Sequence, residues 1–181
     1  MFARTPRLLL RPGWIEDAPA LAAAISDRAV VDNLATAPWP YTVTEAEQFL
    51  SHRPDPMQLS LVILRRTLGA PQLIGSIGLK RLHDGAAEIG FWITRTCWGL
   101  GFATEAGRAM IDIARHALGL EELRATTFAD NFSSQNVLAK LGFTPSGNAL
   151  RHCAARDAAL PARSFRMRLD QGAEGLISLA A

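Results

Sequence analysis

The pattern of apolar and polar residues divides the chain into segments of two kinds. Short apolar runs, which are typical of buried strands, lie at residues 8–10, 60–64, 73–79, 87–94, 124–128 and 164–169. Apolar residues at helical spacing cover residues 16–26 and recur in segments that end before Pro54, at Gly119 and at Gly142. The predicted order is β-α-α-β-β-β-α-β-α-β-β, which combines consecutive strands with helical crossovers and favours the α+β class.

Turn and cap residues mark the ends of these segments. Thr44 and Glu47 have the spacing of a capping box, so the second helix is expected to begin there, and Ser133 or Ser134 is expected to begin the fourth. Turn residues at 69–71 and 84–85 separate three successive strands and predict an antiparallel meander, while residues 27–41 are expected as a loop. The sequence therefore predicts a mixed, mainly antiparallel twisted sheet flanked by about four helices.

Composition narrows the class of the protein. With 181 residues, 49% hydrophobic and 20% charged, the chain is expected to form a single domain, with a core over about residues 7–170 and a tail at 171–181. A net charge of +2 is too small to indicate a nucleic-acid partner. The separated Cys97 and Cys153 predict neither a disulfide framework nor a zinc site, and fit a reducing cytoplasm. No apolar run is long enough for a signal peptide or a membrane span, so no membrane partner is expected.

A glycine-rich turn precedes the third predicted helix. Residues 98–106 read WGLGFATEA, and glycine lets a ligand approach the backbone beside the unpaired N–H groups and positive dipole end of a helix. This arrangement predicts a phosphate site, although a plain strand-to-helix turn is the alternative. The dinucleotide fingerprint fails because Thr104 stands where its third glycine belongs, and the P-loop sequence is absent.

Two landmarks together resemble the GNAT superfamily of acetyltransferases. Its pyrophosphate loop, Q/R-x-x-G-x-G/A, matches this chain at Gly101 and Ala103, with Trp98 at the Q/R position. The sequence WGxGxATEA is itself a signature of the RimJ/RimL-like branch. The second landmark, N-x-x-A-x-x-L-Y-x-K-L-G-F, is similar to the stretch from Asn131 to Phe143. The resemblance extends over about residues 7 to 145.

The resemblance implies acetyl-CoA as cosubstrate, with no metal. Pantetheine is then expected to lie along a strand that splays from its neighbour, with the pyrophosphate on the glycine loop. Arg95 either helps to bind phosphate or is a solvated charge. The cofactor-binding residues implied are Phe91, Trp92, Ile93, Trp98, Gly99, Leu100, Gly101, Phe102, Ala103, Thr104, Asn131 and Ser134.

Two catalytic residues are implied. Many family members carry a Tyr that protonates the thiolate at the position of Leu138, and Leu cannot do so. Ser134, four residues earlier on the same helix face, is the donor that the RimJ/RimL-like branch implies, or else it caps the helix. Glu88 is the best candidate for a general base, the alternative being an exposed strand carboxylate. Glu105 is expected to be a first-turn helix carboxylate.

The expected reaction is direct attack of a primary amine on acetyl-CoA in a ternary complex. The acceptor is either a protein N-terminal α-amine or a small-molecule amine, and a homodimer is suggested by family habit. The alternative is a non-catalytic acyl-CoA-binding or regulatory module. Aromatic residues that either line the acceptor pocket or belong to the core are Trp14, Trp39, Tyr41 and Trp92. The histidines lack metal-ligand spacing, and the arginines at 151, 156, 163, 166 and 168 either meet an acidic substrate surface or are solvated.

Overall fold

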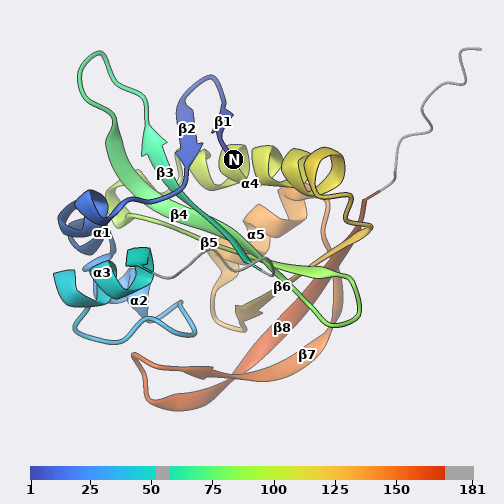
Figure 1. The fold of residues 1–181 in the computed structure, drawn as a ribbon. Coiled ribbons are helices and arrows are strands. Elements are labelled where there is room, and N and C mark those ends of the chain that lie inside the picture. Colours follow the sequence, from blue (N-terminus) through green and yellow to red (C-terminus); the bar gives the residue numbers. More distant parts are fainter. Residues whose placement is uncertain (52–57, 170–181) are drawn as a thin grey trace, which may run out of the picture.

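An eight-stranded sheet is the centre of the computed structural model, which describes residues 1–51 and 58–169 (Figure 1). Its order is β1-β2-β3-β4-β5-β6-β8-β7, and every neighbouring pair is antiparallel except β5 and β6, which run parallel. The strands are β1 (Ala3–Arg4), β2 (Leu8–Arg11), β3 (Gln58–Arg65), β4 (Gln72–Arg81), β5 (Ala87–Ile93), β6 (Glu122–Phe128), β7 (Thr144–Cys153) and β8 (Ala158–Arg168). The predicted mixed, mainly antiparallel sheet is confirmed.

Helices cover the two faces of this sheet in separate groups. They are α1 (Ala18–Ile25), α2 (Arg28–Val31), α3 (Val43–Ser51), α4 (Phe102–Asp112), which continues as a π-helical turn (Ile113–Ala117), and α5 (Phe132–Leu141). Figure 1 shows α1, α2 and α3 gathered together, away from α4 and α5. Within the described residues, no helix has the length and apolar character needed to cross a membrane.

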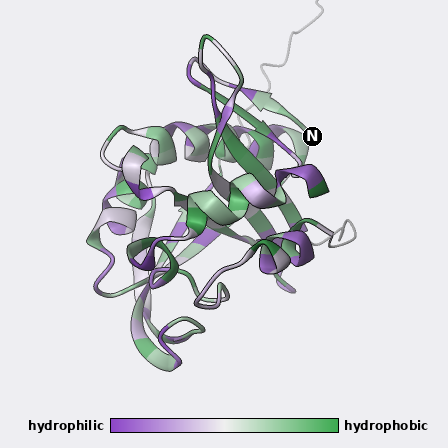
Figure 2. Cartoon of the chain, turned by 90° about the vertical axis from the view of Figure 1, so that its left-hand side faces the viewer, coloured by the Kyte–Doolittle hydropathy of each residue, from purple (hydrophilic) through white to green (hydrophobic). Residues whose placement is uncertain are grey.

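The alternation of side chains along β5 explains why the core has two parts. Ala87, Ile89 and Ile93 point into the cluster formed with α4 and α5, whereas Trp92 packs against the clusters of α1, α2 and α3. Figure 2 shows the hydrophobic residues, coloured green, concentrated in the central strands. Each residue of β5 is thereby assigned to one of the two faces.

A glycine allows α4 and α5 to pack closely. A Cβ at Gly107 of α4 would lie only 2.5 Å from Cδ1 of Leu141, the last residue of α5. Because this glycine lacks a side chain, Leu141 fits against the backbone of α4 and both helices bury their apolar faces in the same core.

Several predicted boundaries are wrong for reasons of local hydrogen bonding. The second long helix begins at Val43, because Glu45 rather than Glu47 reaches back to the residue before the helix: the Thr42 N–H donates to Glu45 Oε2 at 2.9 Å, and the Thr42 hydroxyl also contacts that carboxylate. The predicted end before Pro54 lies outside the described residues. The first predicted helix begins as a 3₁₀ turn (Ile15–Asp17) and continues as α1.

The segment at 27–41, expected as a loop, contains α2. Asp27 caps this short helix by accepting a hydrogen bond from the N–H of Ala29 at 2.8 Å. Val30 and Val31 are buried in a cluster with Ile25, and this burial stabilises a helix that is too short to form by itself. The helix α2 is the one that the expected count of about four did not include.

A polar network joins the turn between β1 and β2 to the first turn of α4. The Glu105 carboxylate accepts hydrogen bonds from the Thr5 hydroxyl at 2.5 Å, the Arg7 N–H at 2.9 Å and Arg7 Nε at 2.6 Å. Arg7 also donates to the Leu100 carbonyl at 3.0 Å and covers the ring of Phe102. Glu105 is thus the first-turn carboxylate that the sequence predicts, and it also anchors the glycine turn that precedes α4.

We predict that Glu105→Gln lowers the melting temperature by about 4–10 °C near pH 7, since charge-assisted hydrogen bonds contribute about 2–3 kcal/mol. Partial burial acts to raise the pKa of Glu105, but the hydrogen bonds from Thr5 and Arg7 and the charge of Arg7 outweigh it, so its pKa lies below the ordinary 4.5. A lowered folded-state pKa means that this stabilisation is complete above pH 4.5 and is lost as the pH falls through the folded-state value.

Thermal melts of both proteins between pH 7 and pH 3 test this. The difference in melting temperature should shrink at acidic pH, and a constant difference would contradict the role of the ionised carboxylate. Glu47→Gln on the exposed face of α3 is the matched control, with no change expected.

Candidate active site

The strands β5 and β6 diverge shortly after they meet. They pair in parallel only at Ala87 with Leu123 and at Glu88 with Arg124, although each strand has seven residues. From Gly90 onward, the described partners of β5 lie on β4 alone. The splayed strand pair expected from the sequence is therefore present, and it leaves β5 at Phe91, Trp92 and Ile93 without a strand partner on the side of β6.

The glycine turn lies at the open end of this splay. Gly99 has φ +74° and Gly101, the N-cap residue of α4, has φ +81°, a backbone region that favours glycine. No side chain caps α4, so the first N–H groups of the helix remain available to an anion. A second feature fixes the turn to the strand, because the indole Nε1 of Trp98 donates to the carbonyl of Ile93 at 2.7 Å.

The start of α5 differs from the sequence prediction. Helix α5 begins at Phe132, because Asn131 is the N-cap and its Oδ1 accepts from the N–H of Ser134 at 3.0 Å. The interpretation of Ser134 as the cap is therefore wrong, as is a helix start at Ser133 or Ser134. The Ser134 hydroxyl takes no part in capping. Leu138, one turn further on, is fully buried in the core beneath α4 and α5.

Glu88 lies at the point where β5 and β6 diverge, and it is neither isolated nor fully exposed. It lies on the same strand face as Gly90 and Trp92, toward α1, α2 and α3. Arg151 of β7 donates to it through Nη1 to Oε1 at 2.5 Å, with Nη2 3.5 Å from Oε2. The side chains of Glu88 and Arg151 are 24% and 34% exposed, so most of the surface of the pair is covered by protein.

Glu88 and Ser134 thus belong to opposite faces of the sheet. Ser134 is carried by α5 on the side of the larger core, whereas Glu88 belongs to the side of the three N-terminal helices. Next to Glu88, Gly90 is exposed, and a Cβ on it would find no described atom within 4 Å. The two predicted catalytic residues are therefore not brought together on one face.

The predicted aromatic set is only partly brought together. Tyr41 and Trp92 pack into the same two clusters beneath α1, α2 and α3. Burial, with a smaller contribution from Glu45, raises the pKa of Tyr41 and keeps its hydroxyl neutral. Trp39 faces the guanidinium of Arg28, with 5.4 Å between the ring centroid and Cζ. Trp14 is apart from them, 52% exposed and stacked on Arg11 at 3.8 Å.

The C-terminal arginines do not form one basic surface. Arg151 pairs with Glu88, Arg156 with Asp130 at 2.8 Å, and Arg163 donates to Gln135 at 3.3 Å, while Arg166 and Arg168 are exposed. Arg95, considered for phosphate, has Nη1 3.5 Å from Asp27 Oδ1 at the start of α2. The pairing of Glu88 with Arg151 was missed by sequence reasoning, because 63 residues separate them and no motif links them.

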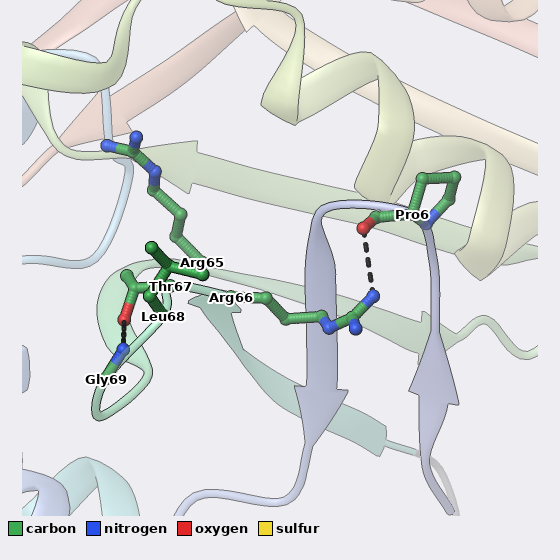
Figure 3. Close-up of a pocket in the computed structure, with 6 residues that line it drawn as sticks. All are labelled: Pro6, Arg65, Arg66, Thr67, Leu68 and Gly69. Atoms are coloured by element: carbon green, nitrogen blue, oxygen red, sulfur yellow. Dashed lines mark hydrogen bonds between the residues drawn. The ribbon is translucent and has the colours of Figure 1, made fainter.

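An open hollow lies elsewhere, at the turn between β3 and β4 (Figure 3). It encloses about 650 Å³ and is lined by Pro6, Arg65, Arg66, Thr67, Leu68 and Gly69. Arg66 donates to the Pro6 carbonyl at 2.9 Å across it. A smaller hollow of about 360 Å³ shares Arg65 and Arg66 and reaches Leu100 and Phe102. The smaller hollow therefore reaches the glycine turn itself, whereas the larger one is lined by residues of the turn after β3 and by Pro6.

Comparison with known proteins agrees with this geometry. Residues 7–144 match the family model described as the acetyltransferase (GNAT) domain. The "Uncharacterized N-acetyltransferase p20" of Bacillus licheniformis is 31% identical over 153 residues, which cover 79% of this chain and 82% of that protein.

Solved structures share the fold. A GNAT-family acetyltransferase from Bacillus anthracis superposes with a TM-score of 0.80 at 20% identity, covering 93% of this chain and 99% of the other. RimJ of Mycobacterium smegmatis, in complex with CoA-disulfide, gives 0.76 at 21% identity, covering 92% and 84%. The family match over most of the sequence and the shared fold lead to one conclusion: this chain belongs to the GNAT family and is an acetyl-CoA-dependent acetyltransferase.

Proposed function

We propose that this protein transfers the acetyl group of acetyl-CoA to a primary amine by direct attack in a ternary complex. The observation that carries the proposal is the placement of Glu88 and Ser134 on opposite faces of the splay between β5 and β6. The amine enters from the face of α1, α2 and α3, and the thiolate departs toward α5. The acceptor is a protein N-terminus or a small molecule.

The proposed cofactor site follows the open edge of β5 to the start of α4. Pantetheine amides hydrogen-bond to the backbone of Phe91, Trp92 and Ile93 in the manner of an added strand. The pyrophosphate lies against the N–H groups of the turn and of the first helical residues, from Trp98 to Thr104. Support comes from RimJ of Mycobacterium smegmatis, which has the same fold and holds a CoA derivative. Asn131 is a further contact to the cosubstrate.

The two free cysteines are both buried, which fits an enzyme of the cytoplasm.

The proposed chemistry needs three groups. A backbone N–H of β5 polarises the thioester carbonyl, so that negative charge can develop on its oxygen. The amine nitrogen bonds to the carbonyl carbon and the carbon–sulfur bond then breaks, while the Ser134 hydroxyl donates a hydrogen bond to the departing thiolate. The thiolate takes the second proton that the nitrogen gives up as the amide forms, so CoA leaves as the free thiol. Glu88 takes the proton that the ammonium must lose before attack. This proton transfer matters more for a lysine amine, with a pKa near 10.4, than for an α-amine near 8.

Acetyl-CoA at about 100 times its dissociation constant should stabilise the protein by about 2.7 kcal/mol, which is about 5–10 °C in melting temperature for this chain length. Free CoA should act similarly, and NADH, which lacks pantetheine, should have no effect. Differential scanning fluorimetry measures this directly. No shift at millimolar acetyl-CoA would overturn the proposed cofactor site.

Ser134→Ala should reduce kcat by about 100-fold while leaving the KM for acetyl-CoA within about twofold, because the hydroxyl acts on the thiolate that forms only during reaction. Steady-state release of free thiol measures both constants. Ser133→Ala, an exposed neighbour on the same helix, is the control and should behave as the wild type. Equal turnover in the two variants would remove Ser134 from the mechanism.

Glu88→Gln should lower kcat/KM for the acceptor about 100-fold at pH 7, since the amide cannot take a proton. The deficit should shrink as the pH rises toward the pKa of the amine, because a free amine needs no base. The pH dependence of kcat/KM between pH 6 and pH 10 measures this, with Glu121→Gln at an exposed position as control. Parallel profiles for variant and wild type would reject Glu88 as the base.

A further inference from the structure

The ion pair between Glu88 and Arg151 occupies the position that the acceptor amine must reach. Glu88 lies where β5 and β6 separate, and Arg151 comes from β7, at the far edge of the sheet. The carboxylate receives a bond of 2.5 Å from the guanidinium. An ammonium that binds Glu88 therefore competes with Arg151 for the same oxygen atoms.

Displaced from Glu88, Arg151 needs another anion. Its side chain is 34% exposed, and a partly buried charge that loses its partner is unfavourable. The carboxylates around Arg124, which is opposite Glu88 in the β5–β6 register, already bind that arginine, Asp84 at 2.7 Å and Glu122 at 2.6 Å. On the β7–β8 hairpin, Arg156 already holds Asp130. An anion supplied by the acceptor itself would restore the charge balance.

Resting on the proposed function, we propose that the acceptor is an amine with a carboxylate beside it. Its ammonium replaces Arg151 on Glu88, and its carboxylate takes the guanidinium, whose planar donors suit a carboxylate in bidentate geometry. The pair of Glu88 with Arg151 is thus replaced by two pairs, ammonium with Glu88 and carboxylate with Arg151, and no charge is left unpaired. Two kinds of molecule carry such an amine and carboxylate: a free amino acid, and a polypeptide with an acidic residue at its N-terminus.

The surroundings of the pair leave room for such a molecule. Gly90, two residues along the same strand face, is exposed and has open space where a side chain would project. Trp92 follows on that face and offers an apolar surface to the rest of the acceptor. Arg151 is then a specificity-determining residue, and its effect should depend on whether the acceptor carries the carboxylate.

The test compares matched acceptors that differ only in this charge. We would measure kcat/KM for alanine against alaninamide, and for tetrapeptides that begin with Asp against those that begin with Asn, with spermidine as a cationic acceptor. The α-amine of alaninamide is less basic and is thus more often unprotonated at pH 8, so a preference for the acid must come from the protein. We expect at least a tenfold higher kcat/KM for the carboxylate form in one of the two pairs. A preference for alanine identifies a free amino acid as the acceptor, and a preference for the Asp peptide identifies an acidic N-terminus.

The ratio between acid and amide is then measured in three variants. Arg151→Gln should bring the ratio to about 1, mainly through a higher KM for the acid, and Arg151→Lys should restore part of the preference. Arg166→Gln, exposed on β8, should leave it unchanged. An unaltered thermal shift with acetyl-CoA shows that each variant is folded. Efficient acetylation without a preference, or a preference that survives Arg151→Gln, would overturn this inference and leave the proposed function intact. Acetylation of no amine in the panel would overturn both.

Discussion

The incomplete pairing of β5 is the constraint on which the rest of the site depends. A central strand ordinarily pairs with a strand on both sides, and beyond Glu88 β5 pairs with a strand only on the side of β4, while on its other side the Ile93 carbonyl accepts from Trp98. Such an edge inside a sheet persists because β5 is held by packing on both faces, with Ile89 and Ile93 buried against α4 and α5 and Trp92 packed against the opposite helices. The packing energy of the two cores therefore holds open a strip of backbone that an extended ligand can complete.

The position of Arg151 beside Glu88 follows from contacts of the β7–β8 hairpin with the N-terminal half of the chain. The N–H of Ala154 donates to the carbonyl of Ala35 at 3.0 Å, and Arg28 donates to the carbonyl of Ala155 at 3.2 Å. Ala155 also packs against the cluster that contains Val30 and Val31. The hairpin is thus fixed at its tip to α2 and the loop that follows, and this fixation determines where Arg151 can reach.

Local patterns in the sequence predicted most of the fold. The predicted positions of β2 to β6 were correct within two residues because buried strands produce apolar runs, and helices began after Gly101 and ended at Gly142 as expected. The two-residue β1 was not predicted, β7 is mostly exposed and received no predicted range, and β8 begins at Ala158, six residues before the predicted start. The predicted starts of two helices were wrong because another polar residue nearby makes the hydrogen bond at the helix start. Thr42 does so at α3, and Asn131 does so at α5. Which residue makes this hydrogen bond depends on the path of the chain before the helix, and the spacing of residue types does not specify that path.

For the candidate site, sequence and structure contributed different parts. The glycine turn, Ser134 and Glu88 were identified from motifs and a family resemblance, because each lies within a short segment. The partners that give these residues their setting, Trp98 with Ile93, Arg7 with Glu105 and Arg151 with Glu88, are side-chain contacts of the folded chain. Two of these three pairs join distant segments, and no pattern of composition or periodicity contains them.

The close packing of α4 on α5 at Gly107 and Leu141 has a consequence for how the site keeps its dimensions. The first turn of α4 and the Ser134 hydroxyl belong to these two helices, which share one core and leave no space to slide past each other. In the proposed cofactor site, the two helices would therefore fix the distance between the phosphates and the sulfur atom of the cosubstrate. That distance is the same whatever acyl group the sulfur carries.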